Sequence, residues 1–155
     1  MEKFLVTIDG PSGVGKTSVG KSIATILNSY FFSSGSIYRS VAKFLLNNKN
    51  VQIEDLKIEI VSEQCNVNGV IFNEEDLYDN EVSVKSSEIA KKVGLRILVK
   101  DCLINYFENL DKPLVIEGRD MGSVVFPDAE HKVYLDADLE TRGKRREGQS
   151  NMEET

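Results

Sequence analysis

Near its N-terminus the sequence reads Phe4-Leu5-Val6-Thr7-Ile8-Asp9-Gly10-Pro11-Ser12-Gly13-Val14-Gly15-Lys16-Thr17. Its first five residues are apolar or β-branched, which is typical of a strand buried on both faces of a sheet. After the glycine-rich segment, apolar residues recur with the spacing of one helical face, at Val19, Ile23, Ile26 and Leu27. This order predicts a strand that leads through a glycine-rich turn into a helix.

The turn itself, Gly10–Thr17, matches the phosphate-loop pattern G-x-x-x-x-G-K-[ST] at every fixed position. Glycines in such a loop let backbone N–H groups turn inward around phosphate oxygens at a helix N-terminus. A lysine at the position of Lys16 places its charge on the β- and γ-phosphates, and the Thr17 hydroxyl can bind Mg²⁺. We therefore expect Gly10–Thr17 and Ser18 to bind a nucleoside triphosphate. The loop alone does not choose between a GTPase, an ATPase and a small-molecule kinase.

A GTPase is a less favoured interpretation of this loop. Proteins of that class are expected to carry D-x-x-G after a later strand and N-K-x-D for the guanine base. No Asp in this chain has Gly three residues later, and Asn48-Lys49-Asn50-Val51 lacks the final Asp.

Composition narrows the class of protein further. The 155 residues are 41% apolar and 28% charged, with a net charge of −6, which excludes a disordered or fibrous chain and argues against broad binding of nucleic acid. Cys65 and Cys102 are too few for a disulfide framework, and no apolar run reaches the roughly 20 residues that span a bilayer. We expect a single-domain, cytoplasmic, monomeric protein with no nucleic-acid or membrane partner.

The remaining patterns predict an α/β fold. Strands are expected at Tyr30–Phe32, Leu114–Ile116 and His131–Leu135, a hairpin around Asn68-Gly69, and helices over Ile37–Leu45, Ile53–Ile60, Val99–Leu110 and from Asp136 onward. Short apolar strands that alternate with helices predict a parallel sheet of four core strands wrapped by helices. The hairpin is expected to form a small insertion beside this sheet.

Two arginines follow the second and third of these core strands. Arg39 lies in Ser34-Gly35-Ser36-Ile37-Tyr38-Arg39, and Arg119 follows Glu117-Gly118. Ligands of parallel α/β sheets bind beyond the carboxyl ends of the strands, and a guanidinium group pairs well with phosphate oxygens. These positions predict a second phosphate site. The alternatives are a solvated helix position or a structural ion pair for Arg39, and a loop salt bridge with Asp120 or Glu117 for Arg119.

At these residues the chain resembles the bacterial cytidylate kinases, which are P-loop nucleoside monophosphate kinases. The resemblance rests on four segments: Ile8–Lys16, Ser34–Arg39, Glu117–Ala129, and Tyr134–Ala137 with the arginines that follow. It implies a P-loop NTPase-type sheet with a monophosphate-binding insertion that contains the hairpin and helices. It also implies ATP as phosphoryl donor, CMP or dCMP as acceptor, and Mg²⁺ as cofactor.

The resemblance also assigns roles to single residues by position. The acceptor site would comprise Ser34, Arg39, Lys100, Arg119 and Asp120, with the two arginines on the acceptor phosphate. Glu117 would hold Mg²⁺ with Thr17, and Arg142 and Arg146 would contact the donor nucleotide from a lid. Phosphoryl transfer needs charge neutralisation more than a general base, so Lys16, Arg39 and Arg119 are the expected catalytic residues and His131 has no assigned role.

The sequence departs from the family pattern at several places. Ser33 replaces a usual Asp, Lys91 replaces a Ser, and Lys100 replaces a base-reading Arg, which loses a planar fork. We place the core at 1–35 and 111–155 and the insertion at about 36–110, and the family's C-terminal strand and helix lie beyond the sequence. Two alternatives therefore stay open: a truncated, non-catalytic nucleotide-binding protein, and a P-loop kinase for another small acceptor.

Overall fold

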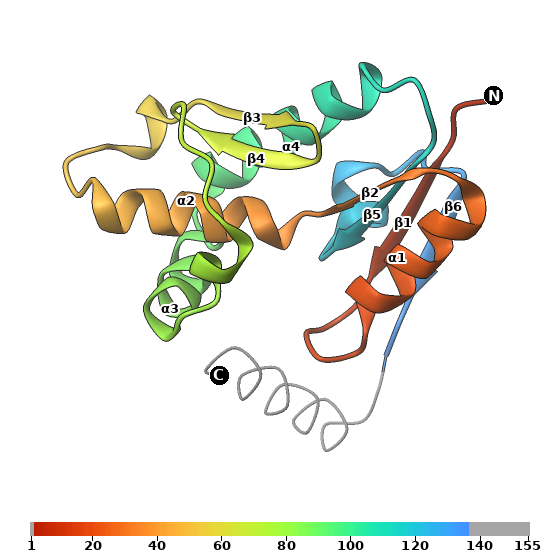
Figure 1. Cartoon of the computed structure of the whole chain (residues 1–155), viewed down its shortest axis with the longest axis horizontal. Helices are drawn as coiled ribbons and strands as arrows, with labels where there is room; N and C mark the ends of the chain where they lie inside the picture. The colour runs from red at the N-terminus through yellow and green to blue at the C-terminus, as the bar shows by residue number, and fades with distance from the viewer. Residues whose placement is uncertain (1, 137–155) are drawn as a thin grey trace. The chain divides into compact units, whose positions relative to one another are not determined.

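The computed structural model describes residues 2–136 of the chain. The chain forms two compact units. Unit 1 comprises Met1–Ser34 and Leu110–Thr155, and unit 2 comprises Gly35–Asn109. Along the sequence, unit 2 is therefore inserted between two strands of unit 1 (Figure 1).

Unit 1 contains a parallel sheet of four strands in the order β2-β5-β1-β6. The strands are β2 (Tyr30–Ser33), β5 (Leu114–Gly118), β1 (Leu5–Asp9) and β6 (His131–Tyr134). The central strands β1 and β5 are almost entirely buried, as their apolar sequences predict. The register pairs Asp9 with Gly118 and Ser33 with Glu117, so the carboxyl ends of these strands meet at one edge. The predicted α/β class and its parallel sheet are confirmed.

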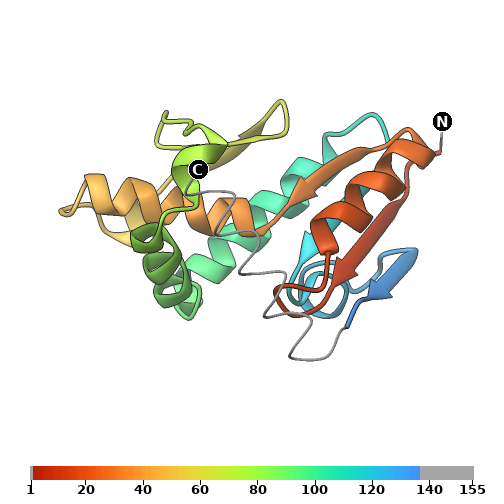
Figure 2. The same ribbon diagram turned by 60° about the horizontal axis from the view of Figure 1, so that its bottom comes forward.

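Helix α1 (Lys16–Leu27) packs on one face of this sheet, as Figures 1 and 2 both show. Its contact with the sheet is built from apolar side chains, among them Val6, Ile8, Val19, Ala24 and Val115. Burial of each large aliphatic side chain here contributes about 1.5–3 kcal/mol. This packing fixes the start of α1, and hence the phosphate loop, against the carboxyl ends of the strands.

A short π-helical turn, η3 (Met121–Val125), follows β5 and contacts β1. The turn was not expected from the sequence, which lacks the periodicity of a regular helix there. Met121 and Phe126 are both buried, and the Phe126 N–H donates to the Met121 carbonyl at 2.7 Å. The turn thus anchors the segment that carries Arg119 and Asp120.

Unit 2 contains three α-helices and two short 3₁₀ helices around a small hairpin. Its elements are α2 (Gly35–Asn47), η1 (Ile53–Asp55), β3 (Ile58–Val61), β4 (Gln64–Val67), η2 (Glu74–Leu77), α3 (Asn80–Ile89) and α4 (Val93–Glu108). Helices α2 and α3 pack together, and α4 packs on β3. Its core consists of aliphatic side chains such as Ile37, Val41, Val82, Leu95 and Leu103.

The helix expected over Ile53–Ile60 is wrong. Only the single 3₁₀ turn η1 forms there, and the chain continues as β3. Ile58 and Ile60 are half-buried while Glu59 and Val61 are exposed, so the segment follows the alternation of a strand rather than the period of a helix.

The hairpin around Asn68-Gly69 is only partly as expected. The antiparallel ladder pairs β3 with β4 through a turn at Ser62 and Glu63, which have φ values of 50° and 64°. Asn68 and Gly69 form a second tight turn, but it closes a single bridge between Val67 and Val70. Both turns form, and the four-residue ladder with β3 is the more extensive pairing of β4.

The other expected elements agree with the structure, except for one that lies outside it. Helix α3 was not expected. Asp79 is its N-cap residue, and the Asp79 carboxylate accepts from the Val82 N–H at 2.8 Å. The helix predicted from Asp136 onward, with Arg142 and Arg146, lies outside the described residues.

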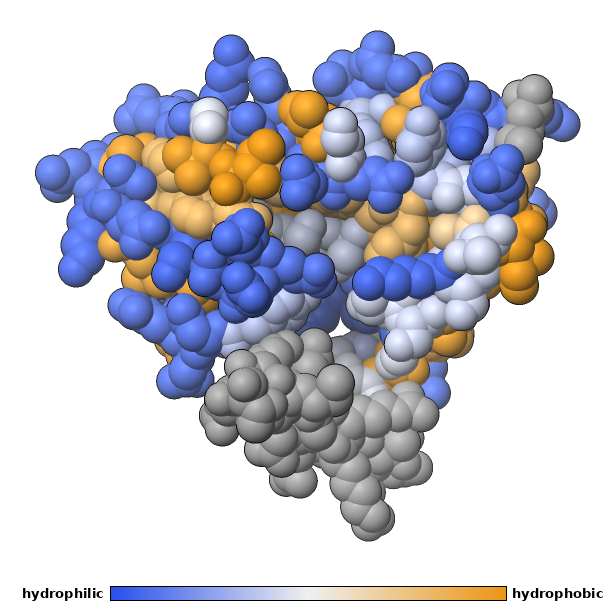
Figure 3. All heavy atoms as spheres, viewed as in Figure 1, coloured by the Kyte–Doolittle hydropathy of each residue, from blue (hydrophilic) through white to orange (hydrophobic). Residues whose placement is uncertain are grey.

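The surface of the described residues is mostly hydrophilic in the view of Figure 3, with smaller apolar areas between the charged groups. In unit 2 the exposed apolar side chains include Val61, Val70 and Ile71 near the hairpin. Within residues 2–136, every helix is too short or too polar to cross a membrane.

Candidate active site

The phosphate loop joins the end of β1 to the start of α1. Gly13 and Gly15 have φ values of 82° and 90°, in the region that favours glycine. A Cβ at Gly10 would lie 2.2 Å from the Leu135 carbonyl oxygen, so only glycine fits there. Gly15 is the N-cap of α1 and has no side chain to cap it, which leaves the N-terminal dipole available to an anion.

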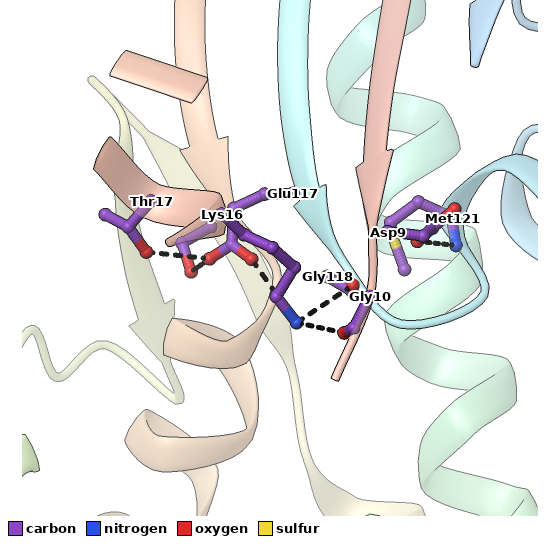
Figure 4. Close-up of polar contacts among 8 residues, drawn as sticks. Asp9, Gly10, Lys16, Thr17, Glu117, Gly118 and Met121 are labelled. Carbon is purple, nitrogen blue, oxygen red and sulfur yellow. Dashed lines mark hydrogen bonds and ion pairs between the residues drawn. The ribbon is translucent and has the colours of Figure 1, made fainter. Parts of the chain in front are cut away.

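Lys16 lies at the carboxyl ends of β1 and β5, with its side chain 12% exposed. Its Nζ donates to the Gly10 carbonyl at 2.5 Å and to the Gly118 carbonyl at 3.2 Å (Figure 4). The Glu117 carboxylate lies 4.0 Å away. These contacts hold the ammonium group between the two central strands, beside the loop that would surround phosphates.

The environment of Lys16 lowers its pKa from the usual 10.5. Burial is the largest cause, because it penalises the charged ammonium, and the nearby Arg119 adds to the effect. Glu117 and Asp9 oppose the shift through their negative charge. A bound polyphosphate would act in the same direction as these carboxylates and favour the charged lysine.

Glu117 is buried near the end of β5 and receives hydrogen bonds from two hydroxyl groups. Thr17 Oγ1 donates to its Oε1 at 3.3 Å, and Ser33 Oγ donates to the same oxygen. Carboxylate and hydroxyl oxygens are hard ligands that suit Mg²⁺, which usually takes one or two carboxylates and completes its shell with water and phosphate. Among residues 2–136, no cluster of three or more His, Cys, Asp or Glu side chains is placed to hold a metal ion.

Arg119 and Asp120 follow β5 directly and are both exposed. Asp120 has a φ of 59° and its carbonyl accepts from the N–H groups of Val124 and Val125 at 3.0 and 3.1 Å. The Asp9 carboxylate accepts from the Met121 and Gly122 N–H groups at 2.7 Å each. Ser34 lies beside this segment, because its N–H donates to the Glu117 carbonyl at 2.9 Å.

Arg39 lies on α2 in unit 2, and its guanidinium is held by the segment before and within α3. Its Nη1 donates to the Leu77 carbonyl at 2.9 Å and to Ser83 Oγ at 3.1 Å. The guanidinium carbon lies 4.6 Å from the centre of the Tyr78 ring, a cation–π distance. These hydrogen bonds engage only two of the five donors of a guanidinium group.

The remaining site residues expected from the sequence lie in three places. Lys100 is half-buried on α4 in unit 2, and Lys91 is exposed in the turn between α3 and α4. Arg142 and Arg146 lie outside the described residues. The structure therefore brings together Lys16, Thr17, Ser34, Glu117 and Arg119 in unit 1, and it places Arg39 and Lys100 in unit 2.

Sequence reasoning assigned no role to several residues that contact this machinery. Ser33 stands where the family pattern has an Asp, and its hydroxyl donates to Glu117. Asp9 lies in the segment Ile8–Lys16, and its two contacts with backbone N–H groups depend on the pairing of β1 with β5. Tyr78 and Ser83 contact Arg39 across about forty residues of sequence. A polar residue at the last position of a buried strand is the one local signal that points to Asp9.

A family model for cytidylate kinase matches residues 6–155 of the chain. The cytidylate kinase of Fusobacterium nucleatum is 36% identical over 155 residues, which cover 94% of this chain and 70% of that protein. The cytidylate kinase of Thermodesulfovibrio yellowstonii is 39% identical over 158 residues, covering 93% and 70%. That of Borreliella burgdorferi is 32% identical over 167 residues, covering 98% and 74%.

The fold is also similar to a crystal structure from Thermus thermophilus. That chain superposes with a TM-score of 0.53 at 16% sequence identity, covering 97% of this chain and 74% of the other. At this identity the similarity concerns the fold alone.

Proposed function

The chain belongs to the cytidylate kinase family, and we propose that it transfers the γ-phosphate of ATP to CMP or dCMP, giving ADP and CDP or dCDP. The observation that carries this proposal is the position of Lys16. Its ammonium group contacts carbonyls at the ends of both central strands, next to a phosphate loop and a buried carboxylate.

The donor side of the reaction uses the loop and Lys16. Backbone N–H groups at the start of α1 bind the β- and γ-phosphates, and Lys16 neutralises charge on the oxygens of the transferring group. Because Lys16 is held by carbonyl oxygens rather than by a close ion pair, its charge is available to the phosphates.

We propose that Thr17 and Glu117 hold Mg²⁺ together with the phosphates of ATP. When bound there, the ion would supply positive charge that offsets the charge developing on the transferred phosphoryl group. Ser33 keeps the Glu117 carboxylate oriented through its hydrogen bond, so the acidic group faces Thr17.

The acceptor side uses Arg119, Asp120 and Ser34 in unit 1 and Arg39 in unit 2. The two guanidinium groups bind the phosphate of CMP, and Asp120 and Ser34 contact the nucleotide. The attacking atom is a phosphate oxygen that is already ionised at neutral pH, so correct positioning contributes more than a general base does. Lys100 is proposed to contact the base from α4.

We further propose that the protein acts in the cytoplasm as a monomer. Cys65 and Cys102 are both free thiols, as a reducing compartment requires. Burial is the main cause that raises the pKa of Cys65 to about 12, so this thiol is unreactive at neutral pH.

The test is coupled ADP release with Mg-ATP and CMP, dCMP, UMP or AMP in parallel. Turnover with CMP and dCMP is expected, and it should fall by at least about a hundredfold in Lys16→Ala, because the charge on the transferring phosphate is lost. Lys21→Ala is the matched control, since this exposed lysine lies on the same helix away from the loop. Unchanged CMP phosphorylation in Lys16→Ala would contradict the mechanism.

The same panel addresses the alternatives. ATP binding without turnover of any acceptor would support a non-catalytic nucleotide-binding protein. Turnover of UMP or AMP that exceeds that of CMP would support a kinase with another acceptor, as the exchange at Lys100 suggests.

A further inference from the structure

Asp9 is the last residue of β1, and its carboxylate holds the backbone of the turn that follows β5. Oδ1 accepts from the Met121 N–H and Oδ2 from the Gly122 N–H, each at 2.7 Å (Figure 4 shows the Met121 contact). Both distances are at the short end for hydrogen bonds between N–H groups and a charged oxygen. Asp9 therefore uses both of its oxygens on one turn.

This turn sets the position of Arg119 and Asp120. Asp120 has a left-handed backbone and accepts two hydrogen bonds from the end of η3, so the backbone of the two residues is tied to the turn. The same turn also packs directly against β1, because a Cβ on Gly122 would lie 2.7 Å from Thr7 Oγ1 and 3.3 Å from Asp9 Oδ2. There is no room for the turn to move toward the sheet.

We propose that Asp9 is a positioning residue for the acceptor nucleotide, which acts by fixing the Met121–Gly122 backbone against β1 and thereby the location of Arg119 and Asp120. The proposal rests on the proposed function, in which those two residues bind the acceptor. It predicts that loss of the Asp9 contacts weakens CMP recognition far more than ATP recognition.

A competing role for Asp9 is electrostatic. Its negative charge lies near enough to Lys16 to favour the charged lysine, so it could instead support ATP binding. The two roles are separable, since a variant that moves the turn without removing the charge affects only the first. Gly122→Ala is such a variant.

The kinetic test compares Asp9→Asn, Gly122→Ala and Glu130→Gln. Asparagine keeps one acceptor oxygen but turns an N–H group toward a backbone N–H, which loses one of the two hydrogen bonds. In Asp9→Asn we therefore expect the KM for CMP to rise about tenfold or more, while the KM for ATP stays within about twofold of that of the unaltered chain. Gly122→Ala should show the same split. Glu130→Gln is the matched control, because Glu130 accepts from the Leu5 N–H at 2.9 Å near the opposite end of β1. A rise in the KM for ATP that equals or exceeds the rise for CMP would overturn the proposal.

A second readout does not depend on activity. Amide hydrogen exchange at Met121 and Gly122 should be about tenfold or more faster in Asp9→Asn than in the unaltered chain, and unchanged there in Glu130→Gln. Unaltered protection of both amides in Asp9→Asn would overturn the proposal even if CMP turnover is found. Conversely, if the unaltered chain phosphorylates no acceptor, the proposed function fails, while exchange still decides whether Asp9 holds the turn.

Discussion

Replacing Ser33 by Ala tests the geometry around the buried carboxylate of Glu117. The substitution removes a hydroxyl donor to Oε1, and Glu117 is only 6% exposed, so water does not readily replace the lost partner. The remaining hydroxyl contact, from Thr17, is longer at 3.3 Å, and the Lys16 ammonium lies 4.0 Å away. A hydrogen bond to a charged group contributes about 1.5–3 kcal/mol, so Ser33→Ala should lower the free energy of unfolding by that amount.

The same substitution should affect the metal-dependent reaction. Groups that orient a metal-binding carboxylate typically change metal affinity or activity by about 10–100-fold when removed, so the Mg²⁺ concentration for half-maximal ADP release should rise at least about tenfold. The assays are urea unfolding and a Mg²⁺ titration of ADP release with CMP as acceptor. Ser33→Thr keeps the hydroxyl and should restore both properties.

Ser29→Ala is the control for Ser33→Ala, because Ser29 Oγ makes only a 3.5 Å contact with the carbonyl of Ala24 in the same unit. It should change neither property appreciably. If Ser33→Ala matches this control in both unfolding and Mg²⁺ dependence, the role assigned to the Ser33–Glu117 contact is wrong.

Three further predictions concern stability. The folded-state pKa of Lys16 lies below its unfolded value of 10.5, so between these two pH values the unfolded chain binds more protons and the free energy of unfolding rises with pH. Urea unfolding measured from neutral pH upward should show a smaller rise in Lys16→Met. Gly20→Ala should lower the free energy of unfolding by about 1 kcal/mol, because the new Cβ would lie 2.4 Å from the Phe31 ring and this overpacking outweighs the gain in helix propensity. Gly94 has open space around it, so Gly94→Ala should leave the free energy of unfolding unchanged or raise it by up to about 1 kcal/mol. Equal effects of the two substitutions would refute the argument. The buried Thr7 hydroxyl has no hydrogen-bond partner within the described part of the chain, so Thr7→Val should leave stability in thermal unfolding unchanged or raise it by about 1 kcal/mol. A loss of stability would show that this hydroxyl does have a hydrogen-bond partner.

Unit 1 could be predicted from sequence because its signals are local. The apolar run of β1, the glycines of the loop and the helical spacing after Lys16 all lie within about twenty-five residues and point to one βα unit. Glycines with positive φ occur at Gly10, Gly13 and Gly15, and the loop pattern fixes the first and the last of these. The chemistry of the loop follows from residue types alone, and the structure adds the carbonyl partners of Lys16.

Unit 2 was harder to predict because its signals conflict. Ile53, Leu56 and Ile60 fit a helical period, yet Ile58 and Ile60 also fit an alternating strand, and contact of β3 with β4 and α4 decides between them. Asn68-Gly69 is a strong turn signal, but no local signal shows that β4 also pairs with the preceding strand, β3. Tertiary contact therefore overrides local propensity in this unit.

The contacts that orient the site could not be predicted, since they join distant segments. Asp9 reaches Met121 only because β1 and β5 are adjacent and in register, and Ser33 reaches Glu117 only because β2 lies on the other side of β5. The partners of Arg39 lie in a segment whose helix was not expected.

The most direct test of the account is to follow the labelled γ-phosphate of ATP in the presence of CMP and to identify the labelled product. The account predicts that the label moves to CDP, that Lys21→Ala leaves this transfer intact, and that Lys16→Ala nearly abolishes it. Label that stays on ATP, or that appears only as inorganic phosphate, would contradict it.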